Sequence, residues 1–417
     1  MSETNSVPAR RDVIAVTPAN AADFGKSYPF AVRQAINLCS HLVYGTLDIE
    51  MPDGKTFRFG GVEDGPYARM IVHDVAFAEK VARGGEVGVA DAYLSGMWSA
   101  EDLEKFLELF CYNQPVIQKL LADKPIIRFV QMIRHWMNRN TKWGSKRNIH
   151  AHYDLGNKFY SQWLDPTMTY SSAIYADGDN DLASAQTRKY RELARQMNIQ
   201  REHHVLEIGC GWGGFAEYVA REIGCKVTGL TISQEQFDFA TKRMADAGLS
   251  DKVEIKFLDY RDEKGLYDRI ASIEMFEAVG EEYWTTYFGQ LRDRLKPDGI
   301  AGLQVITIQE ALYPNYRREL DFIRRYIFPG GMLPTATIMR ELGDLYGLKL
   351  ATDRMFGIDY ARTLSQWRDT FLEKWPSLTT LGFDERFRRM WEFYLSYCEA
   401  GFRAGTIDVR QMVYRKS

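Results

Sequence analysis

Apolar and polar positions follow two different periods in the first part of the chain. Residues 30–45 carry apolar side chains at helical spacing. Residues 46–61 alternate between apolar and polar on both sides of Asp53-Gly54, a dipeptide typical of a tight hairpin turn. Helical spacing returns in two further segments, around 75–83 and 99–121. This mixture of helices and a hairpin predicts a small α+β domain.

From about residue 149 the pattern changes to short apolar runs that alternate with amphipathic segments. The apolar runs predict strands at 203–208, 226–231, 253–259, 267–275 and 299–306. The segments between them predict helices at 213–223, 233–247 and 281–296. Strands that alternate with helices build parallel sheets, so we predict an α/β fold with a doubly wound, mostly parallel sheet.

Residues 124–148 differ from both regions because they contain seven Lys or Arg residues and no acidic residue. Apolar Ile127, Val130, Ile133 and Trp136 recur there at helical spacing. Such a basic, Trp-bearing segment is typical of an anionic membrane surface. A helix packed between two domains, with its basic residues on the wet face, would have the same pattern. Either interpretation makes the segment a linker.

Composition excludes several classes of protein. The formal net charge of −3 gives no global field for nucleic acid. The five cysteines are scattered without a CxxC pair, which predicts neither a disulfide framework nor a zinc site and fits a reducing cytoplasm. The N-terminus lacks a signal-peptide pattern, and no run reaches about 18 apolar residues, so we expect neither export nor a membrane span.

The stretch VLEIGCGWGGFAEYVA at 205–220 places Glu207 at the end of a predicted strand, ahead of a glycine-rich loop and a helix. The dinucleotide fingerprint G-x-G-x-x-G is satisfied there. However, the next predicted strand ends in VTGLTIS, without the acidic residue that binds a dinucleotide ribose. A carboxylate at Glu207 would repel a pyrophosphate and suit a cationic cofactor. The loop therefore favours S-adenosylmethionine and a class I, Rossmann-like methyltransferase over a dehydrogenase.

Several motifs resemble those of the cyclopropane-fatty-acid synthases and the related mycolic-acid methyltransferases. The matching stretches are AHYDLGNKFYSQWLDPTMTYSSAIY (151–175), VLEIGCGWGGFAEYVA (205–220), VTGLTISQEQ (227–236), DYRD (259–262), DRIASIEMFEAVG (268–280), YIFPGGMLP (326–334), FGIDYARTLSQW (356–367) and FRAGTIDVRQMVYRK (402–416). HYDLGN together with the later FPGGMLP is highly specific. GVADAYLSGMW at 88–98 also resembles the small N-terminal domain of the bacterial synthases.

The resemblance implies which residues contact S-adenosylmethionine. They are Tyr170 and Ser171, then Glu207, Gly209, Gly211 and Gly213 of the glycine loop, then Thr231 and Gln236, and finally Asp259, Tyr260 and Arg261. In the family, the Thr and the Gln serve the ribose, and the aromatic and polar residues of DYRD line the adenine. Taken alone, Thr231 or Gln236 would be read as part of a surface turn or a helix N-cap.

The family's chemistry implies that the double bond of an acyl chain attacks the sulfonium methyl group, which leaves a carbocation that must lose a proton. Such a cation needs an apolar pocket from which water is excluded. In the family a bound bicarbonate takes the proton, held by a Cys, a Glu, a His, a Tyr and a backbone group. The corresponding positions here are Ser172, Glu277, Gln304, Tyr360 and Ile306.

Two of these positions depart from the family pattern. Ser172 replaces the Cys and Gln304 replaces the His, and no histidine follows His204. Serine and glutamine can hydrogen-bond an anion, but Gln304 cannot titrate as a histidine does. The site could still bind bicarbonate and make a cyclopropane. Alternatively, the cation is deprotonated in another way, which gives a methyl-branched or methylated unsaturated chain.

We therefore expect a methyltransferase that acts on unsaturated acyl chains of membrane phospholipids at the cytoplasmic face of the inner membrane. A small-molecule methyltransferase and a non-catalytic lipid-binding protein are the alternatives. An anionic membrane surface is the expected partner of residues 124–148, nucleic acid is not expected, and relatives of this kind are commonly homodimers. The expected parts are a disordered N-terminus (1–21), a lipid-engaging domain (22–123), a basic linker (124–148) and a methyltransferase domain (149–417).

Overall fold

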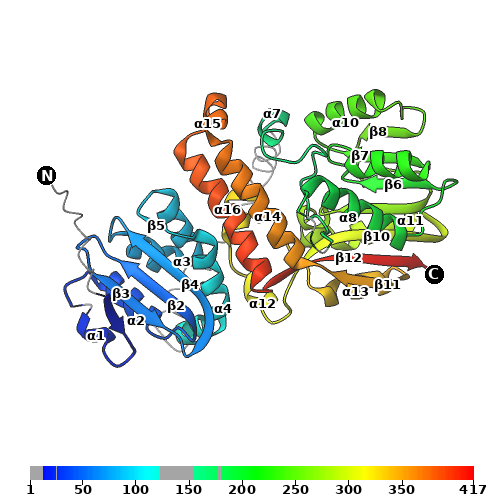
Figure 1. Cartoon of the computed structure of the whole chain (residues 1–417). Helices are drawn as coiled ribbons and strands as arrows, with labels where there is room; N and C mark the ends of the chain where they lie inside the picture. The colour runs from blue at the N-terminus through cyan, green and yellow to red at the C-terminus, as the bar shows by residue number, and fades with distance from the viewer. Residues whose placement is uncertain (1–12, 25, 123–154, 177, 179) are drawn as a thin grey trace. The chain divides into compact units, whose positions relative to one another are not determined.

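The computed structural model describes residues 13–24, 26–122, 155–176, 178 and 180–417 (Figure 1). Its contacts group the chain into two units. One contains Met1–Thr141 and Glu385–Ala400, and the other contains Lys142–Asp384 and Gly401–Ser417. Residues 385–400 thus belong to the first unit, whereas the sequence pattern assigned them to 149–417. The predicted linker at 124–148 lies outside the described residues.

The first unit is built on a five-stranded sheet in the order β1-β3-β2-β4-β5. Its strands are β1 (Val13–Val16), β2 (Tyr44–Glu50), β3 (Thr56–Gly60), β4 (Glu63–Val72) and β5 (Trp98–Ala100). The predicted hairpin is confirmed, since β2 and β3 pair antiparallel around Gly54, whose φ is +87°. The prediction of disorder over 1–21 is wrong for β1, whose β-branched residues pair in parallel with β3.

Helices from both ends of the sequence complete the first unit. They are α1 (Ala21–Phe24), α2 (Phe30–Cys39), α3 (Phe77–Leu94), α4 (Leu103–Ala122) and, as far as Ala400, α16 (Glu385–Arg403). On α16 the ring of Phe393 lies 5.5 Å from that of Tyr93 on α3, and Arg389 Nη1 donates to the Tyr93 carbonyl at 3.2 Å. These contacts explain why a late segment belongs to the early unit.

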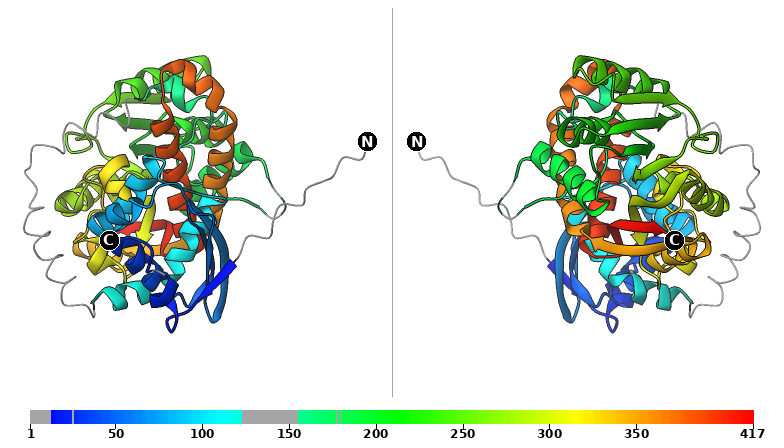
Figure 2. Two further views of the ribbon diagram at one scale, coloured as in Figure 1. Left: turned by 90° about the vertical axis from the view of Figure 1, so that its left-hand side faces the viewer. Right: turned by 90° about the vertical axis from the view of Figure 1, so that its right-hand side faces the viewer.

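The second unit contains a seven-stranded sheet in the order β11-β12-β10-β9-β6-β7-β8. Its strands are β6 (His204–Ile208), β7 (Lys226–Thr231), β8 (Val253–Phe257), β9 (Tyr267–Ile273), β10 (Leu295–Ile308), β11 (Leu348–Met355) and β12 (Ile407–Lys416). The first five pair in parallel, as predicted. The last two add an antiparallel edge that was not predicted, shown in Figure 2 with β12 in red beside β11 in orange.

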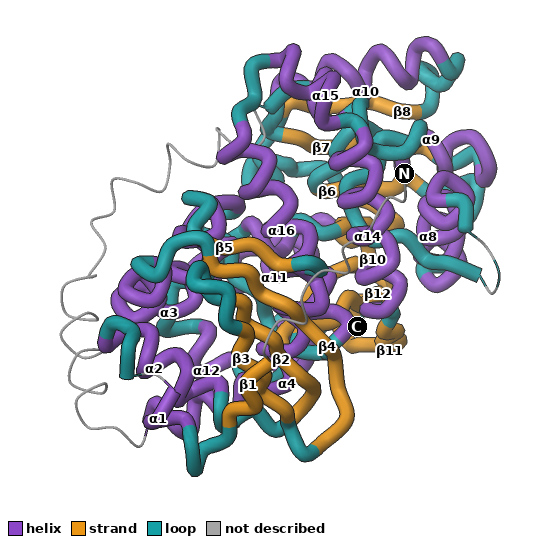
Figure 3. Tube along the Cα trace, turned by 60° about the vertical axis from the view of Figure 1, so that its left-hand side comes forward, coloured by secondary structure: helices purple, strands orange, loops and turns teal. Residues whose placement is uncertain are grey.

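Both faces of this sheet are covered. Neighbouring Val205 and Leu206 of β6 belong to different apolar clusters, because successive side chains of a strand point to opposite faces. Figure 3 shows β6, β7 and β8 as successive strands of the sheet. The α-helices of the unit are α7 (Asn157–Tyr160), α8 (Leu182–Gln196), α9 (Gly214–Tyr218), α10 (Gln234–Asp246), α11 (Trp284–Arg294), α12 (Tyr313–Tyr316), α13 (Ala336–Leu345), α14 (Gly357–Glu373) and α15 (Trp375–Leu378).

Shorter helical turns connect these elements: η1 (Val219–Ile223), η2 (Phe276–Ala278), η3 (Glu281–Tyr283), η4 (Ile323–Ile327) and η5 (Thr379–Leu381). The prediction of a doubly wound α/β fold is confirmed, with the antiparallel edge as its addition. Among the helices that the structure describes, none combines the length and the apolarity needed to cross a bilayer.

Candidate active site

The loop between β6 and α9 forms a backbone cradle at the carboxyl end of the parallel strands. Gly209, Gly211 and Gly213 have φ values of +77°, +52° and +82°, in the left-handed region that favours glycine. A Cβ atom on Gly209 would lie 2.7 Å from Cγ of Met275, whereas one on Gly211 would meet nothing within 4 Å. A ligand can therefore approach the backbone closely here.

Glu207 is the penultimate residue of β6, beside this cradle, and is only 3% exposed. Within the described residues its Oε2 atom has no hydrogen-bond partner. Burial raises the pKa of the Glu207 carboxyl to about 8. A buried carboxyl oxygen without a partner needs a ligand group to satisfy it. A cation or hydroxyl donor would do so, and S-adenosylmethionine carries both.

The loop that follows β7 lies next to the cradle because β7 pairs with β6. Here Thr231 Oγ1 donates to Gln236 Oε1 at 2.9 Å and accepts from the Ser233 backbone N–H at 3.1 Å. The Ser233 side chain caps α10 by accepting from the Gln236 N–H. The two predicted ribose residues are thus brought together in the structure, bonded to each other.

The predicted adenine residues follow β8, which pairs with β7. The Arg261 guanidinium holds the Asp259 carboxylate through two hydrogen bonds of 2.9 and 2.6 Å and keeps the pKa of that carboxyl below its usual value. The same guanidinium lies 5.9 Å from the Tyr260 ring centre. Arg261 is therefore bound to Asp259. Of the three residues predicted to line the adenine, Tyr260 is the one with a flat apolar ring.

Tyr170 and Ser171 approach from the segment before α8. The Tyr170 ring packs 5.3 Å from both Tyr160 and Trp367. Ser171 Oγ accepts a 2.6 Å hydrogen bond from Nζ of Lys189, which is fully buried. Burial lowers the pKa of Lys189 to about 7. Lys189 was not predicted as a site residue, because no sequence pattern distinguishes it from an exposed lysine of an amphipathic helix.

The centre of the predicted base site is a residue that was not predicted, Glu274. Its Oε1 accepts from the Ser172 backbone N–H and from Gln304 Nε2, both at 2.8 Å. Its Oε2 accepts from the Tyr360 hydroxyl at 2.6 Å. Three of the five predicted positions therefore converge on one carboxylate. Burial raises the pKa of Glu274, and the charge of Lys189 is the largest effect that opposes this.

The backbone of Glu274 is also unusual. Its φ is +51°, a left-handed conformation that is uncommon for a residue with a side chain and often marks a functional site. Its N–H donates to the Gln304 carbonyl at 2.8 Å, which holds this conformation directly after β9. The position could have been found in the sequence, since Glu274 lies three residues before Glu277 in the same motif.

The other two predicted positions form a neighbouring pair. Glu277 Oε1 accepts from the Ile306 N–H at 2.5 Å, and within the described residues its buried Oε2 has no partner. Burial, together with the charge of Glu274, raises the pKa of Glu277 to about 8. Ser172 contributes backbone groups to the site, its N–H to Glu274 and its carbonyl to Gln304, because its hydroxyl donates to the Ala173 carbonyl at 3.0 Å. The expectation that this hydroxyl serves the anion is therefore not met.

Aromatic rings enclose the base site. Tyr360 lies 4.5 Å from the Phe402 ring and 6.2 Å from the Trp367 ring. Trp367 in turn packs on Tyr170, so the same aromatic group reaches the cofactor side. Such walls exclude water and present π-faces to a cation.

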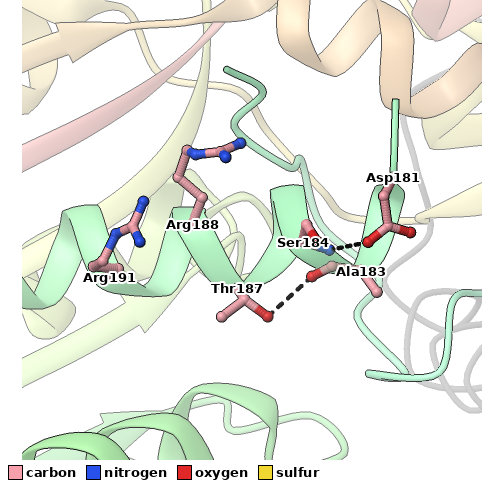
Figure 4. Close-up of a pocket in the computed structure, with 6 residues that line it drawn as sticks. All are labelled: Asp181, Ala183, Ser184, Thr187, Arg188 and Arg191. Carbon is pink, nitrogen blue, oxygen red and sulfur yellow. Dashed lines mark hydrogen bonds between the residues drawn. The ribbon is translucent and has the colours of Figure 1, made fainter. Parts of the chain in front are cut away.

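A surface hollow of about 410 Å³ lies along α8 (Figure 4). It is lined by Asp181, Ala183, Ser184, Thr187, Arg188 and Arg191. All six belong to one helix and its N-cap, and the predicted site residues are not among them. In the part of the chain that the structure describes, no group of three or more His, Cys, Asp or Glu residues is placed to hold a metal ion.

Comparisons with known proteins identify the family of the chain. The family model described as mycolic acid cyclopropane synthetase matches residues 140–412. The tuberculostearic acid methyltransferase UfaA1 of Mycobacterium tuberculosis is 38% identical over 81% of this chain and 80% of its own. The cyclopropane-fatty-acyl-phospholipid synthase of Escherichia coli K12 is 33% identical over 88% of this chain and 96% of its own.

A solved structure supports the same relationship. The mycolic acid cyclopropane synthase CmaA1, complexed with SAH and CTAB, superposes with a TM-score of 0.62 and 29% identity, over 65% of this chain and 98% of that chain. The glycine cradle and the buried Glu207 lie within residues 140–412, which the family model matches. The chain therefore belongs to the mycolic acid cyclopropane synthetase family and is an S-adenosylmethionine-dependent methyltransferase of the cyclopropane-fatty-acyl-phospholipid synthase type.

Proposed function

We propose that this enzyme methylates a carbon of the double bond in unsaturated acyl chains of phospholipids, and that Glu274 accepts the proton lost by the resulting carbocation. The observation that carries the proposal is the convergence of Ser172 N–H, Gln304 and Tyr360 on the Glu274 carboxylate. By resemblance, these positions hold bicarbonate in the family. A carboxylate presents the same pair of anionic oxygens, so Glu274 supplies from the chain itself the base that bicarbonate supplies elsewhere.

The residues of the cradle fit the cofactor. Tyr170, Ser171, the glycine loop, Thr231 and Gln236 would hold S-adenosylmethionine, and Glu207 would offset its positive charge. When bound, the cofactor supplies an electrophilic methyl group and leaves as S-adenosylhomocysteine. The π-electron pair of the substrate forms the new carbon–carbon bond, and the neighbouring carbon becomes the cation.

Glu274 then completes the reaction. Its carboxylate takes a proton either from a carbon next to the cation, where the freed electron pair forms a new double bond, or from the transferred methyl group, where the freed pair closes a three-membered ring. The hydrogen bonds from Ser172 N–H, Gln304 and Tyr360 favour the ionised carboxylate, which a general base requires. The rings of Tyr360, Trp367 and Phe402 keep water from the cation.

Of the two products, we propose the methylated unsaturated chain. Two of the four family side chains that hold bicarbonate, the Cys and the His, are replaced here by Ser172 and Gln304. Among the relatives above, identity is higher to the protein named a methyltransferase, at 38%, than to the one named a cyclopropane synthase, at 33%. These two observations support the choice.

The test uses S-adenosylmethionine and liposomes of monounsaturated phospholipid, with gas chromatography–mass spectrometry of the released chains after double-bond derivatisation. We expect a product one CH₂ heavier that retains a double bond, formed at the same rate with and without added bicarbonate in degassed buffer. Glu274→Gln should lower turnover by about 10²-fold or more while cofactor binding, measured by calorimetry, is unchanged. A rate that depends on bicarbonate would contradict the role of Glu274, and a product without a double bond would show a cyclopropane.

The substrate class also supports a location at the cytoplasmic membrane face. Phospholipid chains reach the enzyme only from a bilayer, so we propose peripheral association through an anionic surface, and a homodimer as in two-domain relatives. Co-sedimentation with liposomes that depends on anionic lipid tests the first point, and light scattering tests the second. Binding that is equal on neutral and anionic liposomes would contradict the anionic surface.

A further inference from the structure

Gln304 is the inner end of a row of three glutamine side chains. Gln304 of β10 and Gln411 of β12 are direct partners across the antiparallel ladder, so their side chains lie on the same face of the sheet. Gln411 Nε2 donates to Gln304 Oε1 at 3.1 Å. Gln411 Oε1 in turn accepts from Nε2 of Gln196, the last residue of α8, at 2.7 Å. At the outer end, Thr352 Oγ1 donates to Gln196 Oε1 at 3.1 Å.

All of these hydrogen bonds run in one direction, from Thr352 toward Glu274. Gln304 and Gln411 are 1% and 0% exposed, so neither amide can exchange its partners for water. Nε2 of Gln304 donates both to Glu274 Oε1 and to the Ser172 carbonyl, the latter at 3.3 Å. A reversed Gln304 amide would face these two acceptors with its oxygen and would face the NH₂ group of Gln411 with its own NH₂. Unpaired buried groups of this kind are costly.

We infer that Gln411 and Gln196 are positioning residues, which hold the NH₂ group of Gln304 on the Glu274 carboxylate through this one-directional chain. The inference rests on the proposed function, in which Glu274 is the base. Amides do not titrate in the physiological range, so this row of glutamines does not transfer protons. The NH₂ and C=O ends of the Gln304 amide have almost the same shape, and the row fixes which end faces Glu274.

Charged and titratable groups from three elements also face Glu274. Lys189 of α8 and Tyr360 of α14 favour its ionised form. The charge of Glu274 in turn raises the pKa of Glu277, in the turn after β9. Glu207 acts on Lys189 and so affects the balance indirectly. Gln304 also donates to Glu274, but its amide carries no charge and does not titrate. The loss of its oriented NH₂ group would therefore raise the proton affinity of Glu274 without adding or removing a charge.

The experiment measures kcat against pH for Gln411→Met, which keeps the length of the side chain and removes both ends of the amide. We expect the acidic limb of the profile to move up by about one pH unit, because Glu274 without its fixed donor ionises only at higher pH. Gln196→Met should shift the limb less, in the same direction. The matched control is Gln309→Met. The exposed Gln309 amide donates to the Gly405 carbonyl and is not part of the row of three glutamines. It should leave the limb in place.

The same series contains Glu274→Gln, which separates the two hypotheses. If Glu274→Gln keeps its activity, the proposed function fails. If Glu274→Gln is inactive, and Gln411→Met loses rate or stability while its acidic limb stays in place, only the positioning role fails. Gln411 would then contribute to packing alone. Should Gln411→Met not fold, Gln196→Met decides between the same outcomes, because Gln196 is only partly buried.

Discussion

Burial changes the charge state of individual residues at this site. Glu207 and Glu277 each have a pKa of about 8, and Lys189 has one of about 7. The cause is the same for all three, since removing a group from water disfavours its charged form. Near neutral pH the two carboxyls are therefore largely neutral. Burial also raises the pKa of Glu274, but three hydrogen-bond donors on its carboxyl group favour the ionised form.

This difference predicts that Glu277→Gln and Glu274→Gln have unequal effects. A neutral Glu277 accepts from the Ile306 N–H, and a glutamine oxygen can do the same. Turnover of Glu277→Gln at pH 7 should thus stay within about tenfold of wild type, against a loss of about 10²-fold or more for Glu274→Gln. Steady-state kinetics on phospholipid liposomes measures both. Equal losses would mean that Glu277 shares the role of base.

The raised carboxyl pKa values also predict how stability depends on pH. A carboxyl with a folded pKa above its unfolded value stabilises the fold at low pH, and this contribution is lost as pH rises from about 4.5 to about 8. Lys189 acts in the opposite sense, because its lowered pKa makes the fold gain stability between about 7 and 10.5. The melting temperature of the ligand-free protein should therefore fall between pH 5 and 7. Glu277→Gln should flatten that slope, and an unchanged slope would contradict the assignment.

Cofactor affinity should depend on the charge of Glu207. If its carboxylate offsets the sulfonium charge, binding favours the ionised form, so affinity rises as pH increases toward and past 8. Calorimetric titration with S-adenosylmethionine between pH 6 and 9 measures this. The cofactor's own amine titrates in the same range, and for this reason Glu207→Gln is the control. The two proteins should differ in their pH dependence, and parallel curves would exclude Glu207.

At the scale of elements, the glycine loop shows what local sequence determines. Its position after a strand and before a helix was predicted correctly, since both neighbours have strong periodic patterns and the glycines are needed for positive φ values. Strands β11 and β12 were not predicted as an antiparallel edge. β12 pairs with β10, which lies more than a hundred residues earlier in the sequence. A local sequence pattern does not reveal so distant a partner.

The loop gives a matched pair of variants. Gly209→Ala and Gly211→Ala both force an alanine into positive φ, at a cost of about 1–2 kcal/mol each. Only Gly209→Ala also brings a Cβ to 2.7 Å from Met275, close to its backbone, while Gly211→Ala meets open space. Gly209→Ala should therefore reduce thermal stability more. Differential scanning calorimetry of the ligand-free proteins compares them, and a larger loss for Gly211→Ala would contradict the account.

At the scale of the whole molecule, the two units are not two continuous stretches of sequence. Glu385–Ala400 belongs to the first unit, although its neighbours in the sequence on both sides belong to the second. Phe393 is 1% exposed and packs near Tyr93, and the Tyr397 hydroxyl donates to Glu86 at 2.6 Å. The first unit is therefore incomplete without a segment from the last tenth of the chain.

This division predicts where two similar substitutions act. Phe393→Ala should destabilise the first unit and Phe371→Ala, fully buried in α14, the second, each by about 3–5 kcal/mol. Hydrogen exchange read by mass spectrometry should increase in α3 for the former and in α14 for the latter. An increase confined to the second unit in Phe393→Ala would show that α16 belongs there.

The sequence by itself determined the properties that depend on local order: the strand and helix periods, the glycine loop, and the motifs that identify the family and its cofactor. Only the tertiary structure decided that Glu274 is the centre of the proposed base site, that Lys189 is buried beside Ser171, and that Gln411 faces Gln304. Glu274 directly follows β9, and Lys189, Gln304 and Gln411 come from α8, β10 and β12. Their contacts depend on strand register, where a slip of one residue would turn each side chain to the other face.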